Sequence, residues 1–376
     1  MSVSRATMIG LSTLAAASLG LAAPAAAETA QASYSTFKPA STTNTNAIDY
    51  DVWDEALKKL VVSFGPSLRQ TAGRAPEGFG TRRIYGHTSR YRLEGNRIGF
   101  SFLDATIVDN LAQYRQDLQA IAKKVDLQSL SRNEQLAFWM NLHNVAMVEK
   151  IGGEWPMRQP RRDKVNGQVI DDSKFIMVEG VALSPRDIRE KIVYPNWKDP
   201  RVIYGFWLGD IGGPSIQRQA FTGENVSRLL NRSAVEFVNS LRGTQKLGSE
   251  LQVSTLYDEV APFYFPDFED NVRSHLSTFA NEDVAKILAD TKKTDAVITE
   301  YDIADLAGGM REPSYSNVQN ATTGRQQSFR IPRSMGLLLA QREEKFRRIL
   351  KKGRTGTVTF SPLELPGEDG VTSEVE

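Results

Sequence analysis

Residues 131–148 read SRNEQLAFWMNLHNVAMV, and this stretch sets the fold that the rest of the chain must support. Ser131 followed by Glu134 is the pattern of a capping box, in which each side chain binds a backbone N–H at the start of a helix. Behind it, most residues from Leu136 to Val148 are apolar. A helix that is apolar on all sides is buried. The stretch therefore predicts a central, buried helix that ends before Pro156.

Shorter segments with helix or strand patterns lie on both sides of this helix. Apolar residues recur at helical spacing in the ranges 50–62, 106–125, 224–241 and 335–351. Strand-like patterns occur at 97–103, in a hairpin over 169–181 with its turn at Glu179-Gly180, at 201–208 and at 296–301. Ser184 and Asp187 form a second capping-box pattern. Together these patterns predict an α+β fold in which the central helix packs on a small, mostly antiparallel sheet.

Residues 1–27 have the three parts of a secretory signal peptide. Arg5 precedes an apolar run from Met8 to Ala23, and Ala25 to Ala27 supply the small residues of a cleavage site. The apolar run is shorter than the roughly 20 residues that a membrane-spanning helix needs. We therefore expect cleavage after Ala27 and a periplasmic or secreted protein.

The composition divides the rest of the chain into segments. Residues 28–47 are rich in Ser, Thr, Ala and Asn without an apolar period, which is typical of a flexible linker. We expect a main globular domain over 48–307 and a polar loop over 308–334. A helix followed by an acidic tail is expected over 335–376.

The composition also excludes several kinds of chemistry. The chain has 46 basic and 45 acidic residues, so its net charge gives no reason to expect nucleic-acid binding. It has no cysteine, which excludes disulfides, thiolate nucleophiles and cysteine metal sites. Its three histidines, His87, His143 and His275, show no spacing typical of metal ligands, and no cofactor is expected.

Several phrases in and after the central helix are similar, in order and spacing, to the motifs of one family. Phe138-Trp139-Met140-Asn141-Leu142-His143-Asn144 is similar to F-W-I-N-x-Y-N, Asp187-Ile188 to the start of D-I-E-H, and Asp199-Pro200-Arg201-Val202 to the start of D-P-R-I-H-F-A-L-N-C. Gly213-Pro214-Ser215-Ile216 stands where the family has C-P-P-L, and 220–226 resembles A-Y-T-x-E-N-L. Over about residues 107–305 the chain resembles the uncharacterised family numbered 547 among the domains of unknown function. The resemblance implies a papain- or transglutaminase-like fold.

The chain departs from this family at the positions that would carry chemistry. The family's two cysteines fall at Leu208 and Gly213, and its two histidines at Glu190 and Ile203. A cysteine hydrolase needs a thiolate beside an imidazole, which lowers the thiol pKa. Because neither partner is present, the resemblance implies a member without cysteine catalysis. We expect an exported binding or scaffolding protein rather than an enzyme.

We expect the binding site in a groove between the central helix and the segment 201–215. Its candidate residues are Trp139, Asn141, His143, Asn144, Arg201, Tyr204, Asp210 and Ser215. His143 has two interpretations, a hydrogen-bonded core histidine or a group that binds a ligand or transfers protons. The alternative function is a hydrolase or an acyl or peptidyl transferase in which His143 activates Ser215 as a relocated nucleophile. A third is a structural domain whose tail binds a partner.

Basic residues crowd the last predicted helix between Arg342 and Arg354, against Glu343 and Glu344. One interpretation is a surface helix whose charges are solvated. The other is a patch for weak contact with an anionic membrane or an acidic partner. The sequence leaves the ligand open, as a small molecule, a peptide or a protein of the cell envelope.

Overall fold

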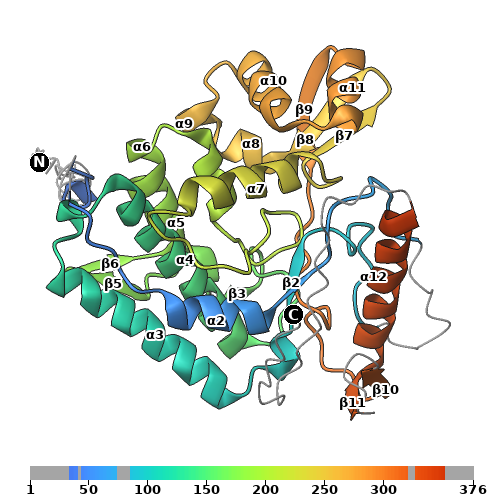
Figure 1. Cartoon of the computed structure of the whole chain (residues 1–376), viewed down its shortest axis with the longest axis horizontal. Helices are drawn as coiled ribbons and strands as arrows, with labels where there is room; N and C mark the ends of the chain where they lie inside the picture. The colour runs from blue at the N-terminus through green and yellow to red at the C-terminus, as the bar shows by residue number, and fades with distance from the viewer. Residues whose placement is uncertain (1–33, 41–43, 74–84, 321–326, 352–376) are drawn as a thin grey trace, which may run out of the picture. The chain divides into compact units, whose positions relative to one another are not determined.

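The computed structural model describes residues 34–40, 44–73, 85–320 and 327–351. The predicted signal peptide, its cleavage site after Ala27 and the acidic tail lie outside these residues. The chain divides into two units, 1–36 and 37–376, and the second holds the domain with the central helix (Figure 1). In the described residues, no helix is long and apolar enough to cross a membrane.

The central helix is α4, Arg132–Glu154, and it is buried along most of its length, as predicted. Ser131 is its N-cap, and the Ser131 hydroxyl accepts a hydrogen bond from the backbone N–H of Glu134 at 3.2 Å. The Glu134 carboxylate, which a capping box would direct at the N-cap, instead accepts bonds from Ile48 N at 3.0 Å and Gly223 N at 2.7 Å. The start of the helix is thereby tied to two distant segments of the chain.

Helices form the main surroundings of α4. It packs against α3 (Ala105–Lys124) and α7 (Val226–Val238), and against two short helical turns, η3 (Ile170–Asp172) and η4 (Ile188–Val193). Figure 1 shows α3 and α4 as neighbours in the unit. The fold is α+β, as predicted. A helix that is apolar on all sides needs cover on all sides, and here the closest cover comes from other helices rather than from a sheet.

In the described residues the strands form small sheets. Four of these are antiparallel pairs: β1 with β2 (Val61–Ser63, Asn96–Ile98), β3 with β4 (Lys164–Val165, Gln168–Val169), β5 with β6 (Ile176–Val178, Val181–Leu183) and β10 with β11 (Tyr315–Asn320, Gln327–Pro332). The fifth has the order β7–β8–β9 (Thr244–Leu247, Glu250–Ser254, Lys293–Ile298), with β9 parallel to β8. The other elements are α2 (Asp51–Leu60), η1 (Phe100–Phe102), η2 (Leu127–Ser129), α5 (Pro185–Asp187), α6 (Tyr194–Asn196), η5 (Pro200–Gly205), α8 (Thr255–Glu259), α9 (Ala261–Tyr264), α10 (Phe268–Phe279), α11 (Glu282–Asp290) and α12 (Arg333–Lys351).

The prediction of a strand at 201–208 is wrong, because Pro200–Gly205 forms the 3₁₀ helix η5. Asp199 caps this helix by accepting a hydrogen bond from Arg201 N at 2.9 Å, and Pro200 stands at its start. A short buried apolar run fits a strand and a buried helix equally well. The capping residue and the proline were the informative signals.

The segment 308–334 is not the long loop that its polar composition predicts. It contains the hairpin of β10 and β11, with a register that runs from Tyr315 opposite Pro332 to Asn320 opposite Gln327. Main-chain hydrogen bonds form such a ladder with many kinds of side chain, so polar composition alone does not exclude a strand.

The hairpin predicted over 169–181 is displaced along the chain. Its turn lies at Glu179-Gly180 as predicted, where both residues have positive φ, 48° and 82°. The paired strands are β5 and β6, while Val169 belongs to the separate pair β3–β4. The second capping box is confirmed, since Ser184 and Asp187 exchange both hydrogen bonds at the start of α5.

The predicted linker over 28–47 ends earlier than expected. Phe37 is buried and packs edge-on against Trp139 of α4, with 5.1 Å between the ring centroids. One aromatic side chain in a polar stretch makes no periodic pattern, yet it covers part of the central helix.

The C-terminal helix α12 begins two residues before its predicted start at 335. It packs on β10 and β11, and its residues Met335 and Leu338 join a buried cluster that includes Phe64 and Leu306. This helix is therefore a part of the domain core and not a separate tail element.

Candidate functional site

The residues predicted to line a groove are packed inside the domain. The structure buries Trp139, Asn141, His143, Asn144, Tyr204, Asp210 and Ser215, and leaves Arg201 half-buried. Arg201 pairs with Asp199, with nitrogen–oxygen distances of 2.6 to 3.1 Å. The Tyr204 hydroxyl lies 3.0 Å from that of Tyr257 and 2.8 Å from Nε2 of His275. These contacts belong to internal packing.

Two asparagines of α4 close the space where the groove was predicted. Asn141 donates to Phe221 O at 2.7 Å and accepts from Phe221 N at 3.0 Å. Asn144 donates to Gly205 O at 2.9 Å and accepts from Trp207 N at 3.0 Å. Each side-chain amide thus both donates and accepts a hydrogen bond, as a backbone peptide group does, and holds a loop against the helix. These contacts engage two of the residues predicted to line the groove in internal packing.

His143 is held by partners at both ring nitrogens. Nδ1 lies 3.0 Å from Asn144 Oδ1, and Nε2 lies 2.9 Å from a guanidinium nitrogen of Arg189. Arg189 in turn makes two hydrogen bonds to Asp171, at 2.6 and 2.7 Å. Burial, reinforced by the charge of Arg189, lowers the pKa of His143 to about 3. A neutral ring that donates from Nδ1 and accepts at Nε2 fits this network, which matches the core-histidine interpretation.

The positions of the family's cysteines and histidines are filled by other side chains and turns. Leu208 and Ile203 are buried, and Glu190 is half-buried. Gly213 lies in a turn in which its N–H donates to Asp210 Oδ1 at 2.7 Å. Burial, opposed in part by Arg161, raises the pKa of Asp210 to about 6. The other Asp210 oxygen, Oδ2, lies 3.7 Å from Arg161.

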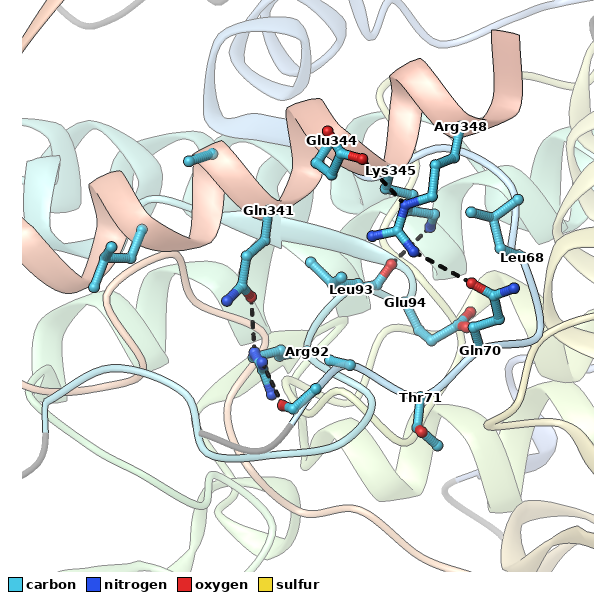
Figure 2. A pocket seen from close by; sticks show the side chains of 14 residues that line it. Leu68, Gln70, Thr71, Arg92, Leu93, Glu94, Gln341, Glu344, Lys345 and Arg348 are labelled. Atoms are coloured by element: carbon cyan, nitrogen blue, oxygen red, sulfur yellow. Dashed lines mark hydrogen bonds and ion pairs between the residues drawn. The ribbon is translucent and has the colours of Figure 1, made fainter. Parts of the chain in front are cut away.

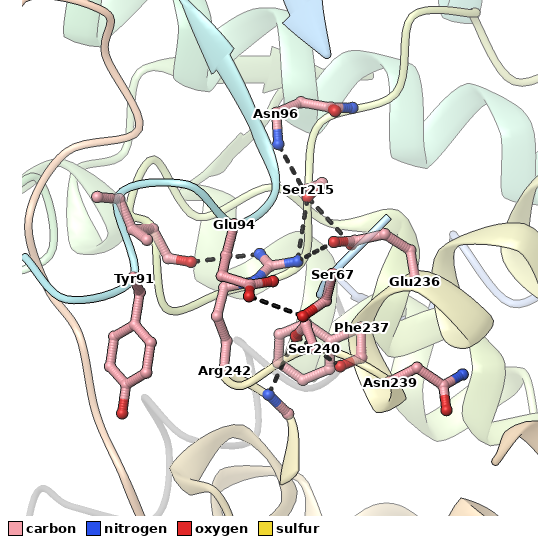
Figure 3. Close-up of polar contacts among 12 residues, drawn as sticks. Ser67, Tyr91, Glu94, Asn96, Ser215, Glu236, Phe237, Asn239, Ser240 and Arg242 are labelled. Carbon is pink, nitrogen blue, oxygen red and sulfur yellow. Dashed lines mark hydrogen bonds and ion pairs between the residues drawn. The ribbon is translucent and has the colours of Figure 1, made fainter. Parts of the chain in front are cut away.

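Figure 3 shows the partners of Ser215, and His143 is not among them. Its hydroxyl lies 3.2 Å from Asn96 N, 3.1 Å from Glu236 and 3.3 Å from Arg242. Because both nitrogens of His143 are engaged elsewhere, these contacts give no support to a Ser215–His143 nucleophile pair.

Ser215 borders a buried ionic cluster that sequence reasoning missed. The cluster consists of the buried Glu94, Arg97, Arg242 and Lys345 and the half-buried Glu236. Glu236 pairs with Arg242, and Arg242 also donates to the backbone oxygens of Ile211 and Gly213 at 3.2 and 2.7 Å. Glu94 accepts from Ser67 at 2.7 Å, and Lys345 donates to Leu93 O at 2.7 Å.

The buried ionic cluster is incompletely paired. Within the described residues, Glu94 Oε2, Arg97 Nε and Arg242 Nε are buried without a hydrogen-bond partner. Unpaired buried polar groups are costly, and each one in a folded protein calls for an explanation. Burial also lowers the pKa of Lys345 to about 8, although Glu94 and Glu236 act in the opposite direction.

A pocket of about 590 Å³ lies against this cluster, between α12 and the segments 68–73 and 92–94 (Figure 2). Arg92, Glu94 and Lys345 are its buried lining residues. Arg92 is fixed by hydrogen bonds to Gln341 at 2.9 Å, to Gly73 O at 2.7 Å and to Ser89 O at 3.2 Å. A lysine on the apolar stripe of the last helix was the sequence signal that could have indicated this site.

The predicted basic surface of α12 is smaller than its composition suggests. Lys345 is buried, and Arg342 donates to Ser63 O at 2.6 Å. Arg347 and Arg348 lie near Glu343 and Glu344, at 3.4 and 3.6 Å. Lys352 and Arg354 lie outside the described residues. In the part of the chain that the structure describes, no group of three His, Asp or Glu side chains could hold a metal ion.

The fold and these contacts define a cysteine-free α+β domain built around one buried helix. Residues 127–238 match the model of a family described as "Protein of unknown function, DUF547". The resemblance to this family is thereby confirmed over that segment, which contains the central helix and all the residues of the predicted groove. A comparison with curated proteins found no match, and a comparison with solved structures found none either.

Proposed function

We propose that the protein is an exported, non-catalytic binding protein, in which the pocket beside α12 is the binding site. The observation that carries this proposal is the contrast between the family's reactive positions and the pocket. The reactive positions of the family hold Leu208, Gly213, Glu190 and Ile203, whereas the pocket is open and lined by fixed charged groups. Small-molecule sites are usually preformed hollows with a few well-placed polar groups.

The rigidity of the pocket supports this proposal. Arg92 is held by three acceptors, and Lys345 is held by Leu93 O, so both cations are in place before a ligand arrives. A preorganised site loses little conformational entropy on binding. The absence of cysteine and the engaged state of His143 support a role without covalent catalysis.

Export is part of the proposal and rests on Arg5, the apolar run and the small residues Ala25 to Ala27. The mature protein recovered from cells should begin at Glu28 or within a residue or two of it. An intact mass that retains Met1, in protein that fractionates with the cytoplasm, would contradict export.

The test of the non-catalytic role is a panel of ester, amide and peptide substrates given to the purified mature protein. We expect no turnover with wild-type protein or with Ser215→Ala. Turnover that is lost in Ser215→Ala or in His143→Ala, in variants that melt like wild type, would establish the hydrolase or transferase alternative and overturn this proposal.

A further inference from the structure

We propose that the pocket beside α12 binds a small organic molecule that carries an anionic head, a carboxylate or a phosphate ester, on an apolar group. This inference rests on the proposed function and specifies its ligand class. It depends on the charges that line the pocket, on the spare hydrogen-bond donors of those groups and on the apolar part of the wall.

The charges of the lining favour an anion. Arg92, Lys345 and Arg348 line the pocket together with two carboxylates, Glu94 and Glu344. Three cations and two anions leave one positive charge, which a single negative charge on the ligand would balance. Glu344 pairs with Arg348 at 3.6 Å, and Glu94 favours the charged form of Lys345 without forming an ion pair with it among the described residues.

Donors remain available at the buried end of the pocket. A lysine ammonium has three N–H groups, and one of those of Lys345 goes to Leu93 O. At the mouth of the pocket, Arg348 donates a hydrogen bond to Gln70 at 3.3 Å (Figure 2). An anion could replace this contact with a neutral group. Charge-assisted hydrogen bonds in a site shielded from water are among the strong ones.

Part of the remaining wall is apolar. Leu68, Leu93 and Leu337 line the pocket with two alanines, and Leu337 is half-exposed on α12. The volume of about 590 Å³ falls in the range of roughly 300–1,000 Å³ that is usual for small-ligand sites. A ligand with an acidic head on a medium-length acyl chain or a small ring therefore fits both the charged and the apolar residues of the lining.

The titration of Lys345 should make ligand binding depend on pH, which a lysine with a purely structural role would not do. Glu94 and Glu236 act to raise the pKa of its ammonium group, and Arg242 and Arg97 act to lower it. Burial lowers its pKa to about 8. As the pH rises through this value the ammonium loses its charge, so affinity for an anion should fall in wild-type protein. In Lys345→Met that pH dependence should disappear.

The experiment measures binding of four probes that share an eight-carbon chain by isothermal titration calorimetry at pH 7. The probes are octanoate, octyl phosphate, octanol and octylamine, and the protein is the mature chain. We expect octanoate or octyl phosphate to bind at least about tenfold more tightly than octanol, because one charge-assisted contact is worth that much. The two anions distinguish a carboxylate ligand from a phosphate ligand.

Three variants locate the site. Arg348→Gln should weaken binding of the preferred anion about tenfold. Leu337→Asp, on an exposed side chain that the fold does not need, should abolish it by placing a negative charge in the wall. Arg347→Gln is the matched control, since Arg347 lies on the same helix outside the pocket lining, and it should bind like wild type.

Each outcome decides the inference. The inference that the ligand is an anion would be overturned if octanol bound as tightly as the anions or if octylamine bound more tightly. The pocket would still be a binding site in that case, provided that Leu337→Asp abolishes the binding. If no probe binds, or if Leu337→Asp leaves binding intact, the inference is overturned. The non-catalytic part of the proposed function would be decided separately, by the substrate panel.

Discussion

The surroundings of His143 and the surroundings of Lys345 are both buried and charged, but they differ in how completely their polar atoms are paired. Around His143, Asp171 and Arg189 satisfy each other and the ring. Around Lys345, three polar atoms of the cluster have no partner among the described residues, and one of the residues concerned, Glu94, lines an open pocket. A fully satisfied network fixes a structure, whereas an incomplete one beside a pocket is where a ligand can contribute hydrogen bonds.

The largest effect should follow truncation of the central helix. Trp139 is almost fully buried and contacts Phe37 and Phe138 edge-on, at 5.1 Å in both cases. Trp139→Ala should cost about 3–5 kcal/mol of unfolding free energy, a large part of the roughly 5–15 kcal/mol typical of a domain. Urea denaturation checks this, and an unchanged urea midpoint would mean that Trp139 is not a core residue.

Breaking the ion pair of Asp171 and Arg189 beside His143 should lower the unfolding free energy nearly as much. A second substitution should reverse much of this loss. Arg189→Met leaves the buried Asp171 carboxylate with only the exposed Arg186 as a partner, at 3.5 Å, which costs about 3–5 kcal/mol. Replacing both residues, with Asp171→Leu and Arg189→Met together, should recover much of the loss, since no lone charge remains.

The same denaturation series measures the single and the double variant. If both lose the same stability, the pair does not neutralise a buried charge, and His143 would then lie in a more solvated environment than its contacts indicate.

The sequence predicted the central helix and its caps better than the surroundings of Lys345. The SRNE start and the apolar run identified α4, and Ser184 with Asp187 identified a cap, because these signals are local. Lys345 and Leu93 are 252 positions apart, so no local pattern joins them into one site. The candidates His143 and Ser215 lie in family motifs, but the motifs do not state whether a side chain faces a groove or the core.

A smaller effect should appear in the pH dependence of stability. His143 has its pKa lowered from 6.5 to about 3 in the folded protein, so the unfolded chain takes up its proton more readily. Its contribution to stability is therefore complete above 6.5 and is lost as the pH falls towards 3.

Comparing His143→Gln with wild type isolates this contribution, because His87 and His275 are present in both proteins. Urea midpoints at pH 7 and pH 5 should fall less steeply in the variant. Equal slopes would mean that His143 is not buried in its neutral form.

The smallest effect is expected at the surface of α12. Arg347 is largely exposed and pairs with Glu343 at 3.4 Å. Arg347→Glu should change the unfolding free energy by about 0–1 kcal/mol. The same variant tests the membrane interpretation: at low salt it should bind anionic vesicles less than wild type does. Wild-type protein that ignores such vesicles would remove that interpretation.

The central claim is that the pocket beside α12, and not the segment around Arg201, binds the ligand. The same substitution can be made in both regions, as Arg348→Gln and Arg201→Gln. Measured by calorimetry with octanoate or octyl phosphate, whichever wild type prefers, Arg348→Gln should weaken binding about tenfold, and Arg201→Gln should leave it unchanged. Loss of binding in Arg201→Gln with retention in Arg348→Gln would contradict the account and return the site to the groove predicted from the sequence.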